Sequence, residues 1–185
     1  MIIAISGMPG AGKSTASKML SRRLGMKRYY MGEIRRELAR KHGMTIQQLN
    51  EIGERYEWTD KEVDDFQRQL GESRDNFIIE GRTSFFLLPD SLKVFLDVDF
   101  DVGSRRIYEE MKGSKNDERN EGVYKTLSDA KKAVKKRIES DRRRYMKYYN
   151  VDIYDRSNYD LVINTTKMKP ATVVKKIAAA AKRRN

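Results

Sequence analysis

Residues 7–14 read Gly7-Met8-Pro9-Gly10-Ala11-Gly12-Lys13-Ser14 and directly follow the apolar stretch Ile2-Ile3-Ala4-Ile5-Ser6. This run fits the pattern GxxxxGK[ST] of a phosphate-binding loop between a buried strand and a helix. Glycine tolerates backbone angles that turn successive N–H groups inward, so such a loop forms an anion-binding nest at the start of the helix. The stretch therefore predicts a strand, a loop that binds a nucleoside triphosphate, and a helix.

Two side chains of the loop have predicted tasks. The ammonium group of Lys13 is expected to contact the β- and γ-phosphates, and the hydroxyl of Ser14 to ligate the Mg²⁺ that bridges them. The alternative is a glycine-rich turn that ends in Lys-Ser by chance, but the strand before, the helix after and all four fixed positions favour the motif. Binding of ATP is assigned to Gly7, Met8, Pro9, Gly10, Ala11, Gly12, Lys13, Ser14 and Thr15.

Length and cysteine content limit the class of protein. The 185 residues suffice for one α/β domain with a sizeable core and are marginal for two. The chain has no cysteine, which excludes a disulfide framework, a thiolate metal site and a thiol nucleophile. Neither a secretory leader nor a stretch of about eighteen apolar residues is visible. We expect a single cytoplasmic domain that is neither secreted nor membrane-spanning.

The chain is strongly basic, with a formal net charge of +12 from 39 Lys and Arg against 27 Asp and Glu. A basic surface can bind nucleic acid by neutralising its phosphates. Two simpler interpretations compete with this one: a cleft for two phosphate compounds needs many cations, and an organism with a basic or salt-adapted proteome would show the same excess everywhere. Charged residues make up 36% of the chain and both signs alternate along the helices, as on solvated faces. We therefore do not expect nucleic acid as a main ligand.

Hydrophobic periodicity predicts five strands that alternate with helices. The strands are expected at residues 2–6, 27–31, 76–80, 92–98 and 160–164. The helices are expected at residues 13–24, 32–41, 45–55 and 59–70, from 101, at 128–149 and from 170. Helical crossovers between strands predict an α/β fold, a five-stranded parallel sheet with helices on both faces. The polar, aperiodic residues 113–122 are expected to form a mobile lid.

Arginines follow the second and third strands, in the segments Gly32-Glu33-Ile34-Arg35-Arg36 and Glu80-Gly81-Arg82. In a doubly wound sheet the carboxyl ends of both strands lie beside the phosphate-binding loop. An arginine at each place can hold an acceptor phosphate that faces the triphosphate. This arrangement favours a small-molecule kinase over a motor, a GTPase or a nucleic-acid ATPase.

The order of these motifs resembles that of the nucleoside monophosphate kinases, most closely the archaeal-type cytidylate kinases. Those enzymes carry a G-x-x-x-R segment, matched by Gly32 and Arg36, and a D/E-G-R segment, matched by residues 80–82. They also carry an arginine cluster before Tyr and an I/V-D-I-x-D stretch, matched by residues 142–145 and 151–155. The likeness covers nearly the whole chain and includes the strand Asp-Leu-Val-Ile-Asn at 160–164.

The resemblance implies a P-loop NTPase fold with acceptor-binding helices and a lid. Its core would be about residues 1–31, 76–112 and 156–185, its acceptor-binding insert about 32–75, and its lid about 113–149. The residues implied to bind the acceptor are Gly32, Arg36, Asp64, Gly81 and Arg82.

Phosphoryl transfer explains why the matched residues are cationic, since the moving group carries dispersed negative charge and catalysis is mostly positioning and electrostatic stabilisation. The catalytic residues are expected to be Lys13 and Arg82 with arginines of the long helix. Among these we prefer Arg142, then Arg137, then Arg144, with Arg143 as a further candidate, because they cannot all share one helical face.

Two further roles follow from the resemblance. Glu80 would hold Mg²⁺ through a bound water molecule; a base for the acceptor is its alternative, but a monophosphate is already ionised, so the magnesium role is preferred. Arg106 would stack on the adenine of ATP, with a solvent-facing helix residue as its alternative.

The acceptor base is the open part of the prediction. Bacterial cytidylate kinases follow Gly-Arg with an Asp that helps to hold the acceptor nucleoside, whereas this chain has Thr83-Ser84-Phe85-Phe86. Residues 45–70 are expected to cover the base, and a solvated amphipathic helix is the alternative for Asp64 and Gln67. The polar candidates there are Asp60, Asp64, Gln67 and Arg68. Tyr56 and Trp58 are core or rim aromatics, and His42 is expected to be a helix C-terminal partner rather than a catalyst.

The leading prediction is transfer of the γ-phosphoryl group of ATP to CMP or dCMP, giving CDP or dCDP and ADP, with Mg²⁺ as cofactor. Kinases of AMP, shikimate or dephospho-coenzyme A are the alternatives on the same fold. A nucleic-acid-associated P-loop ATPase would use the basic surface, and a non-catalytic nucleotide sensor would need no acceptor-site arginines. The sequence does not fix the oligomeric state, and a monomer is the default expectation.

Overall fold

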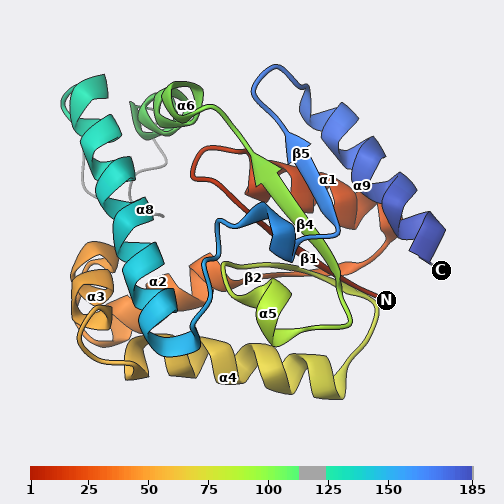
Figure 1. The fold of residues 1–185 in the computed structure, drawn as a ribbon, viewed down its shortest axis with the longest axis horizontal. Helices are drawn as coiled ribbons and strands as arrows, with labels where there is room; N and C mark the ends of the chain where they lie inside the picture. Colours follow the sequence, from red (N-terminus) through yellow and green to blue (C-terminus); the bar gives the residue numbers. More distant parts are fainter. Residues whose placement is uncertain (113–123, 185) are drawn as a thin grey trace.

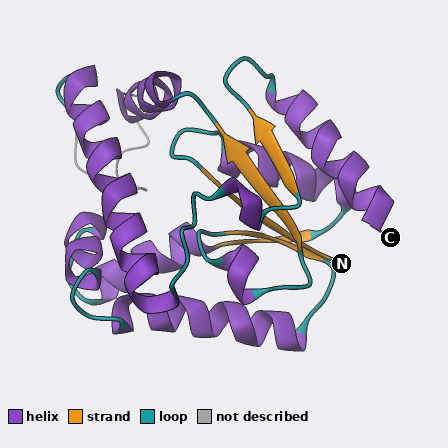
Figure 2. Ribbon diagram, viewed as in Figure 1, coloured by secondary structure: helices purple, strands orange, loops and turns teal. Residues whose placement is uncertain are grey.

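The apolar runs of the sequence form a central parallel sheet in the computed structural model, which describes residues 1–112 and 124–184. The strand order is β2-β3-β1-β4-β5, so the strand that precedes the phosphate-binding loop is central (Figures 1 and 2). Ile5 of β1 pairs with Glu80 of β3 and with Val94 of β4. The strands are β1 Ile2–Gly7, β2 Lys27–Tyr30, β3 Phe77–Glu80, β4 Leu92–Asp97 and β5 Leu161–Asn164. The predicted α/β fold is confirmed.

Two helices cover one face of the sheet. They are α1, Lys13–Leu24, and α9, Pro170–Arg184, which pack against each other (Figure 1). Both are amphipathic, and their apolar sides, such as Leu20 and Ile177, join the buried residues of the strands in one core cluster. Because β1 runs into the loop that begins α1, this core holds the loop in place.

The other face carries the segment between β2 and β3, which folds into three helices. These are α2 Met31–Lys41, α3 Ile46–Gly53 and α4 Trp58–Ser73. Thr45 and Gln48 form the predicted capping box at the start of α3. Leu38, Leu49 and Val63 anchor the three helices to Ile79 of β3 in a second core cluster. The segment is thus a helical insert that packs on this face of the sheet.

A long helix, α8 Leu127–Tyr149, stands beyond the carboxyl ends of the strands (Figure 1). It packs against α6, Phe100–Lys112, and its second half contacts α3. The expected lid segment 113–122 lies outside the described residues. In the described ranges, no helix combines the length and apolar character needed to cross a membrane.

Two short elements were not predicted from the sequence. The helix α5, Ser84–Leu87, follows the Glu-Gly-Arg segment, and a 3-10 turn at Arg156–Asn158 precedes β5. Phe85 of α5 packs on Phe95 and Tyr159 under the sheet. One turn of helix is too short for a periodic signal, which explains why the sequence pattern missed it.

Candidate active site

The phosphate-binding loop is held open by three glycines with positive φ: 145° at Gly7, 76° at Gly10 and 83° at Gly12. A Cβ atom on Gly7 would lie 2.1 Å from the carbonyl oxygen of Leu96, and one on Gly10 would lie 2.2 Å from that of Gly103. Gly12 is the left-handed N-cap of α1. The loop therefore requires glycine both for its backbone angles and for its close contact with neighbouring backbone.

Lys13 and Ser14 begin α1 and face the end of β3. The Nζ of Lys13 donates to the carbonyl oxygens of Gly7 and Met8 at 2.9 and 2.8 Å. Burial lowers the pKa of Lys13 to about 7, against the opposing effect of the negative Glu80 carboxylate. The hydroxyl of Ser14 donates to Oε1 of Glu80 at 2.7 Å. A hydroxyl and a carboxylate thus meet beside the loop.

Glu80 is only 3% exposed and is fixed by further partners. Its Oε2 accepts hydrogen bonds from Ser17 at 2.8 Å and from Nη2 of Arg28 at 2.7 Å. Arg28 lies on the edge strand β2, so one carboxylate joins α1, β2 and β3. The sequence analysis did not single out Arg28.

A cleft of about 310 Å³ lies between the loop and the helices α2, α3, α4 and α8. Gly7, Pro9, Gly10, Gly12, Lys13, Ser14 and Thr15 line one end of it. Met8 and Ala11 do not line the cleft, and Ala11 is buried in the core under the loop. Gly32, Arg36, Asp64, Gly81 and Arg82 also line the cleft, so the residues assigned to the donor and acceptor share one cavity.

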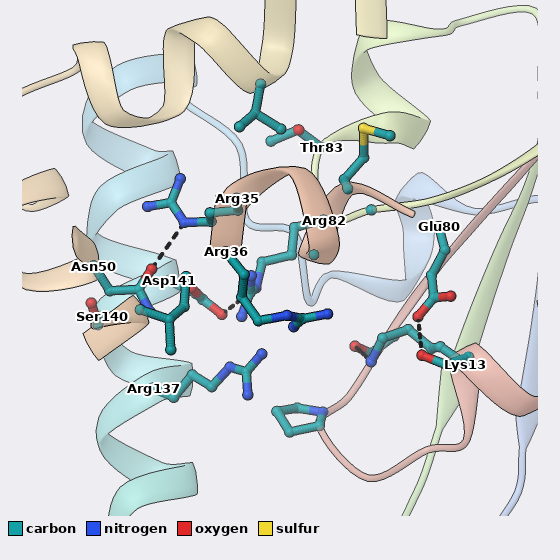
Figure 3. A pocket seen from close by; sticks show the side chains of 18 of the residues that line it. Lys13, Arg35, Arg36, Asn50, Glu80, Arg82, Thr83, Arg137, Ser140 and Asp141 are labelled. Carbon is teal, nitrogen blue, oxygen red and sulfur yellow. Dashed lines mark hydrogen bonds and ion pairs between the residues drawn. The ribbon is translucent and has the colours of Figure 1, made fainter. Parts of the chain in front are cut away.

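Three arginines from three elements lie in the middle of this cleft. Arg36 comes from α2, Arg82 follows β3, and Arg137 comes from α8; Figure 3 shows their side chains between Asp141 and Lys13. Arg36 also lies 5.0 Å from the centre of the Tyr30 ring. Guanidinium groups suit phosphate oxygens because they donate several hydrogen bonds in one plane. The centre of the cleft is therefore built for an anion.

The preferred order of the lid arginines needs correction. Arg142 does not line the cleft: its side chain is 53% exposed and its Nε lies 3.5 Å from Oδ2 of Asp152. Arg143 is 58% exposed and pairs with Glu54. Arg144 is 1% exposed and lies behind the cleft wall. Residues 137 and 142 are five positions apart, which puts them on different faces of α8. Arg144 lies two turns beyond Arg137 and is held by Asp60 and Asp141, so Arg137 alone of these four arginines lines the cleft.

Behind the wall, Arg144 belongs to a buried charge network. Its Nε lies 3.0 Å from Oδ2 of Asp60, and its Nη2 lies 3.1 Å from Oδ1 of Asp141. Asp60 also pairs with Nη1 of Arg35, and Asp141 with Nε of Arg82, both at 2.7 Å. Burial alone would raise the pKa of Asp141, but the positive charges of Arg82, Arg144 and Arg137 lower it below its ordinary value. The network links α2, α4, α8 and the end of β3.

A second polar network surrounds Asp64, which is 5% exposed. Its carboxylate accepts hydrogen bonds from Gln67, Thr83 and Tyr149 at 2.9, 2.8 and 2.5 Å. Burial raises the pKa of Asp64 to about 6, against the hydrogen bonds from Tyr149 and Thr83. The alternative of a solvated helix face is therefore wrong for Asp64 and Gln67.

Of the other polar candidates, Asp60 lines the cleft, whereas Arg68 is exposed and lines a separate cavity.

Arg106 connects the loop to the end of β5. Its guanidinium donates to the carbonyl oxygens of Gly10, Thr165 and Thr166 at 3.3, 3.0 and 3.1 Å. The alternative of a solvent-facing residue is therefore wrong for Arg106, whose hydrogen bonds fix the loop.

Tyr56 and Trp58 are 59% and 38% exposed, which makes them rim aromatics, and His42 caps the end of α2 beside Trp58.

Most of the residues that sequence analysis missed are polar side chains on helices, with Arg28 on β2 and Tyr154 in the turn before β5 as exceptions. Many of their partners come from other elements. Asp141 and Tyr145 follow the apolar spacing of α8 and are buried, a signal that a polar residue on an apolar helical face could have given. The missed residues that line the cleft include Arg35, Asn50, Ser140, Asp141, Tyr145 and Tyr154.

A phosphate-binding loop after the central strand of a 2-3-1-4-5 parallel sheet, facing arginines across one cleft, defines a kinase of the P-loop class. The model of the cytidylate kinase-like family matches residues 2–167, and the chain belongs to that family. It is 36% identical over 182 residues to the cytidylate kinase of Thermococcus sibiricus, covering 97% of this chain and 87% of the relative. It is 34% identical over 182 residues to that of Methanobrevibacter smithii, covering 98% and 99%.

Solved structures share the fold at low sequence identity. An uncharacterized protein from Eubacterium ventriosum superposes with a TM-score of 0.70 at 20% identity, covering 97% of both chains. A shikimate kinase from Bacteroides thetaiotaomicron gives a TM-score of 0.65 at 16% identity, covering 98% of both chains. These similarities show the fold of the chain. The identity of the acceptor has to be inferred from the residues of the cleft.

Proposed function

We propose that this protein transfers the γ-phosphoryl group of ATP to CMP or dCMP, giving CDP or dCDP and ADP. One observation carries the proposal: in a chain of the cytidylate kinase-like family, Arg36, Arg82 and Arg137 face the phosphate-binding loop across a single cleft. A loop that only sensed or hydrolysed a triphosphate would need no second anion site.

The reaction in this site is an in-line displacement. An oxygen of the acceptor monophosphate bonds to the γ-phosphorus, the bond from that phosphorus to the β,γ-bridging oxygen breaks, and ADP leaves with the electron pair. The acceptor oxygen is already ionised, so no general base is needed. Lys13 holds the donor, Arg36 and Arg82 hold the acceptor, and Arg137 offsets the charge of the moving group.

The residues fit Mg²⁺ as the cofactor. Ser14 Oγ and Glu80 Oε1 lie 2.7 Å apart, and both are hard oxygen ligands of the kind that Mg²⁺ prefers. In the described part of the chain there is no group of three or more His or acidic side chains that could hold a metal. The remaining ligands would be substrate phosphates and water, with Glu80 acting through water. When bound, the ion would neutralise charge on the β- and γ-phosphates.

The proposed division of labour follows the architecture. The core is about residues 1–31, 76–112 and 156–185, the acceptor-binding insert about 32–75, and the lid about 113–149. Because α8 already lines the cleft, we propose that the part of the lid it forms helps to exclude water that would otherwise hydrolyse ATP. We also propose that the protein acts as a monomer in the cytoplasm.

An acceptor panel tests the function. The purified protein is incubated with ATP, Mg²⁺ and one of CMP, dCMP, UMP, AMP, shikimate or dephospho-coenzyme A, and both ADP and the phosphorylated product are measured by chromatography. We expect ADP and CDP, or ADP and dCDP, in equal amounts. Failure of both CMP and dCMP to raise ADP release above the control without acceptor would overturn the proposal. Stimulation by RNA or DNA alone would favour an ATPase.

A variant pair separates the acceptor site from general effects of lost charge. Arg36→Ala should raise the KM for CMP about 30-fold or more, since a charged hydrogen bond to phosphate is lost, while leaving the Kd for ATP unchanged. Arg40→Ala is the matched control because Arg40 is exposed one turn further along α2. Equal effects of the two substitutions would contradict an acceptor role for Arg36.

A further inference from the structure

A side-chain amide is held in one orientation on the wall of the cleft. Asn50 lies on α3, is half-buried and lines the cleft. Its Oδ1 accepts a hydrogen bond from Nε of Arg35 at 3.0 Å and a longer one from Nη1 of Arg144 at 3.5 Å. Guanidinium groups only donate, so the amide must turn its oxygen toward the two arginines and its nitrogen away from them.

This orientation leaves a donor without a protein acceptor. Among residues 1–112 and 124–184, the side-chain hydrogen bonds of Asn50 all use Oδ1, and Nδ2 makes none. Because Asn50 lines the cleft, its Nδ2 is a donor that a ligand can reach, and this wall favours a ligand that presents lone pairs.

The position of the wall indicates which part of the ligand it meets. Figure 3 shows Arg36, Arg82 and Arg137 between Asn50 on one side of the cleft and Lys13 on the other. With the acceptor phosphate at these arginines and the triphosphate at Lys13, the remainder of the acceptor nucleotide extends toward Asn50. The amide therefore faces the base.

We propose that Asn50 selects cytosine over uracil by donating an Nδ2 hydrogen to the ring nitrogen N3. This inference rests on the proposed function. N3 of cytosine carries a lone pair, whereas N3 of uracil carries a hydrogen, and O2 is an acceptor in both bases. Because the arginines hold Oδ1, Asn50 cannot rotate to accept the uracil N3–H. Uracil would place a donor against a donor, and desolvated groups left unpaired in this way give strong discrimination.

The substitution Asn50→Asp reverses the polarity of the atom facing the cleft. A carboxylate still accepts from Arg35 and Arg144, so the wall keeps its anchoring contacts, and an acceptor replaces the amide nitrogen. The kcat/KM values for CMP and UMP are measured with saturating ATP. We expect the ratio of CMP to UMP to fall by about 100-fold or more, because CMP loses a hydrogen bond and UMP gains one.

A second variant and a control exclude trivial causes. Asn50→Ala removes the donor without adding an acceptor, so kcat/KM for CMP should fall about tenfold or more while that for UMP changes little. Gln48→Glu makes the same charge change on the same helix, and Glu preserves the capping box with Thr45. Its ratio should stay within about twofold of the native value.

The outcomes distinguish this inference from the proposed function. An unchanged CMP to UMP ratio in both Asn50 variants, with CMP still phosphorylated, would refute the role of Asn50 and leave the kinase assignment intact. A native protein that phosphorylates neither CMP nor dCMP would refute both. A ratio that falls equally in Gln48→Glu would show that added charge, and not the Asn50 amide, alters base preference.

Discussion

The Nε of Arg82 and the Oδ2 of Asp141 lie 2.7 Å apart, and their ion pair joins the end of β3 to α8. The Arg82 side chain is 23% exposed and lines the cleft, whereas Asp141 is 1% exposed. A buried carboxylate therefore orients an arginine that still offers N–H groups to a ligand. The same carboxylate holds Arg144 and accepts from Tyr154 at 3.0 Å.

Asp141→Asn should destabilise the fold, because it removes the countercharge of two arginines at a buried site. Removing one partner of a buried ion pair costs about 3 kcal/mol or more. Denaturant unfolding at pH 7.5 measures this as a lower midpoint. Glu139→Gln, on an exposed position of α8, is the control and should change the free energy of unfolding by less than about 0.5 kcal/mol. Equal midpoints for the two variants would show that the network does not stabilise the fold.

Arg137→Ala should lower kcat by about 1,000-fold, as expected for an arginine that offsets charge on a transferring phosphoryl group. Arg142→Ala should lower it less than about threefold, since Arg142 is exposed outside the cleft. Steady-state rates with CMP and ATP measure both. The pair is matched in residue type, helix and charge. A larger loss in Arg142→Ala would restore it as the lid arginine and would require α8 to rotate during the reaction.

The affinity for ATP should fall as the pH rises above 7. The pKa of Lys13 is about 7 in the free protein, lowered mainly by burial, and the phosphates of bound ATP raise it. Binding therefore takes up a proton, and the Kd should rise by up to about tenfold per pH unit between pH 7.5 and 9. Titration calorimetry measures the Kd and the proton uptake. Lys13→Arg should bind with little pH dependence, and a flat native profile would contradict the lowered pKa.

Asp64→Asn should stabilise the protein at pH 7.5. The pKa of Asp64 in the folded state is about 6, above its ordinary value of 3.8, so folding is penalised when the carboxylate is charged. The penalty is complete above pH 6 and disappears as the pH falls toward 4. The Oδ1 of asparagine can accept from Gln67 and Thr83, and its Nδ2 can donate to the Tyr149 hydroxyl, so the gain should be about 1–3 kcal/mol at pH 7.5 and smaller at pH 5.

Asp65→Asn is the control for this prediction, because Asp65 is the exposed neighbour on α4. Its free energy of unfolding should stay near the native value at both pH values. A stabilisation of Asp64→Asn that is the same at pH 5 and 7.5 would contradict the raised pKa.

Local patterns predicted most of the fold. The strands and helices follow the periodicity of apolar residues, and glycines mark several of their ends. The capping box of α3 was predicted from Thr45 and Gln48. The order of the strands could not be deduced from the sequence, because the periodicity of one strand does not identify its neighbours in the sheet. The one-turn helix α5 was missed because four residues carry no period.

The site was predictable where a motif fixes both residue type and spacing. Glu80 ends β3, Arg82 follows it and Arg36 lies on the helix that follows β2, so the sheet brings all three near the loop. No local pattern in the sequence distinguishes Arg137 from Arg142. The packing of α8 against α3 and α6 determines which of them lines the cleft. Asn50 was missed because the orientation of its amide is set by Arg35 and Arg144, which come from two other helices.

The buried charge network also constrains how relatives of this chain can diverge. The carboxylates of Asp60 and Asp141 are shared by Arg35, Arg82 and Arg144, and Arg144 is only 1% exposed. Replacing either aspartate by a neutral residue leaves buried arginine charge without its partner, so lineages that lose an aspartate must also replace an arginine. Positions 60 and 144 should accordingly covary across the family, although 84 residues separate them in the chain.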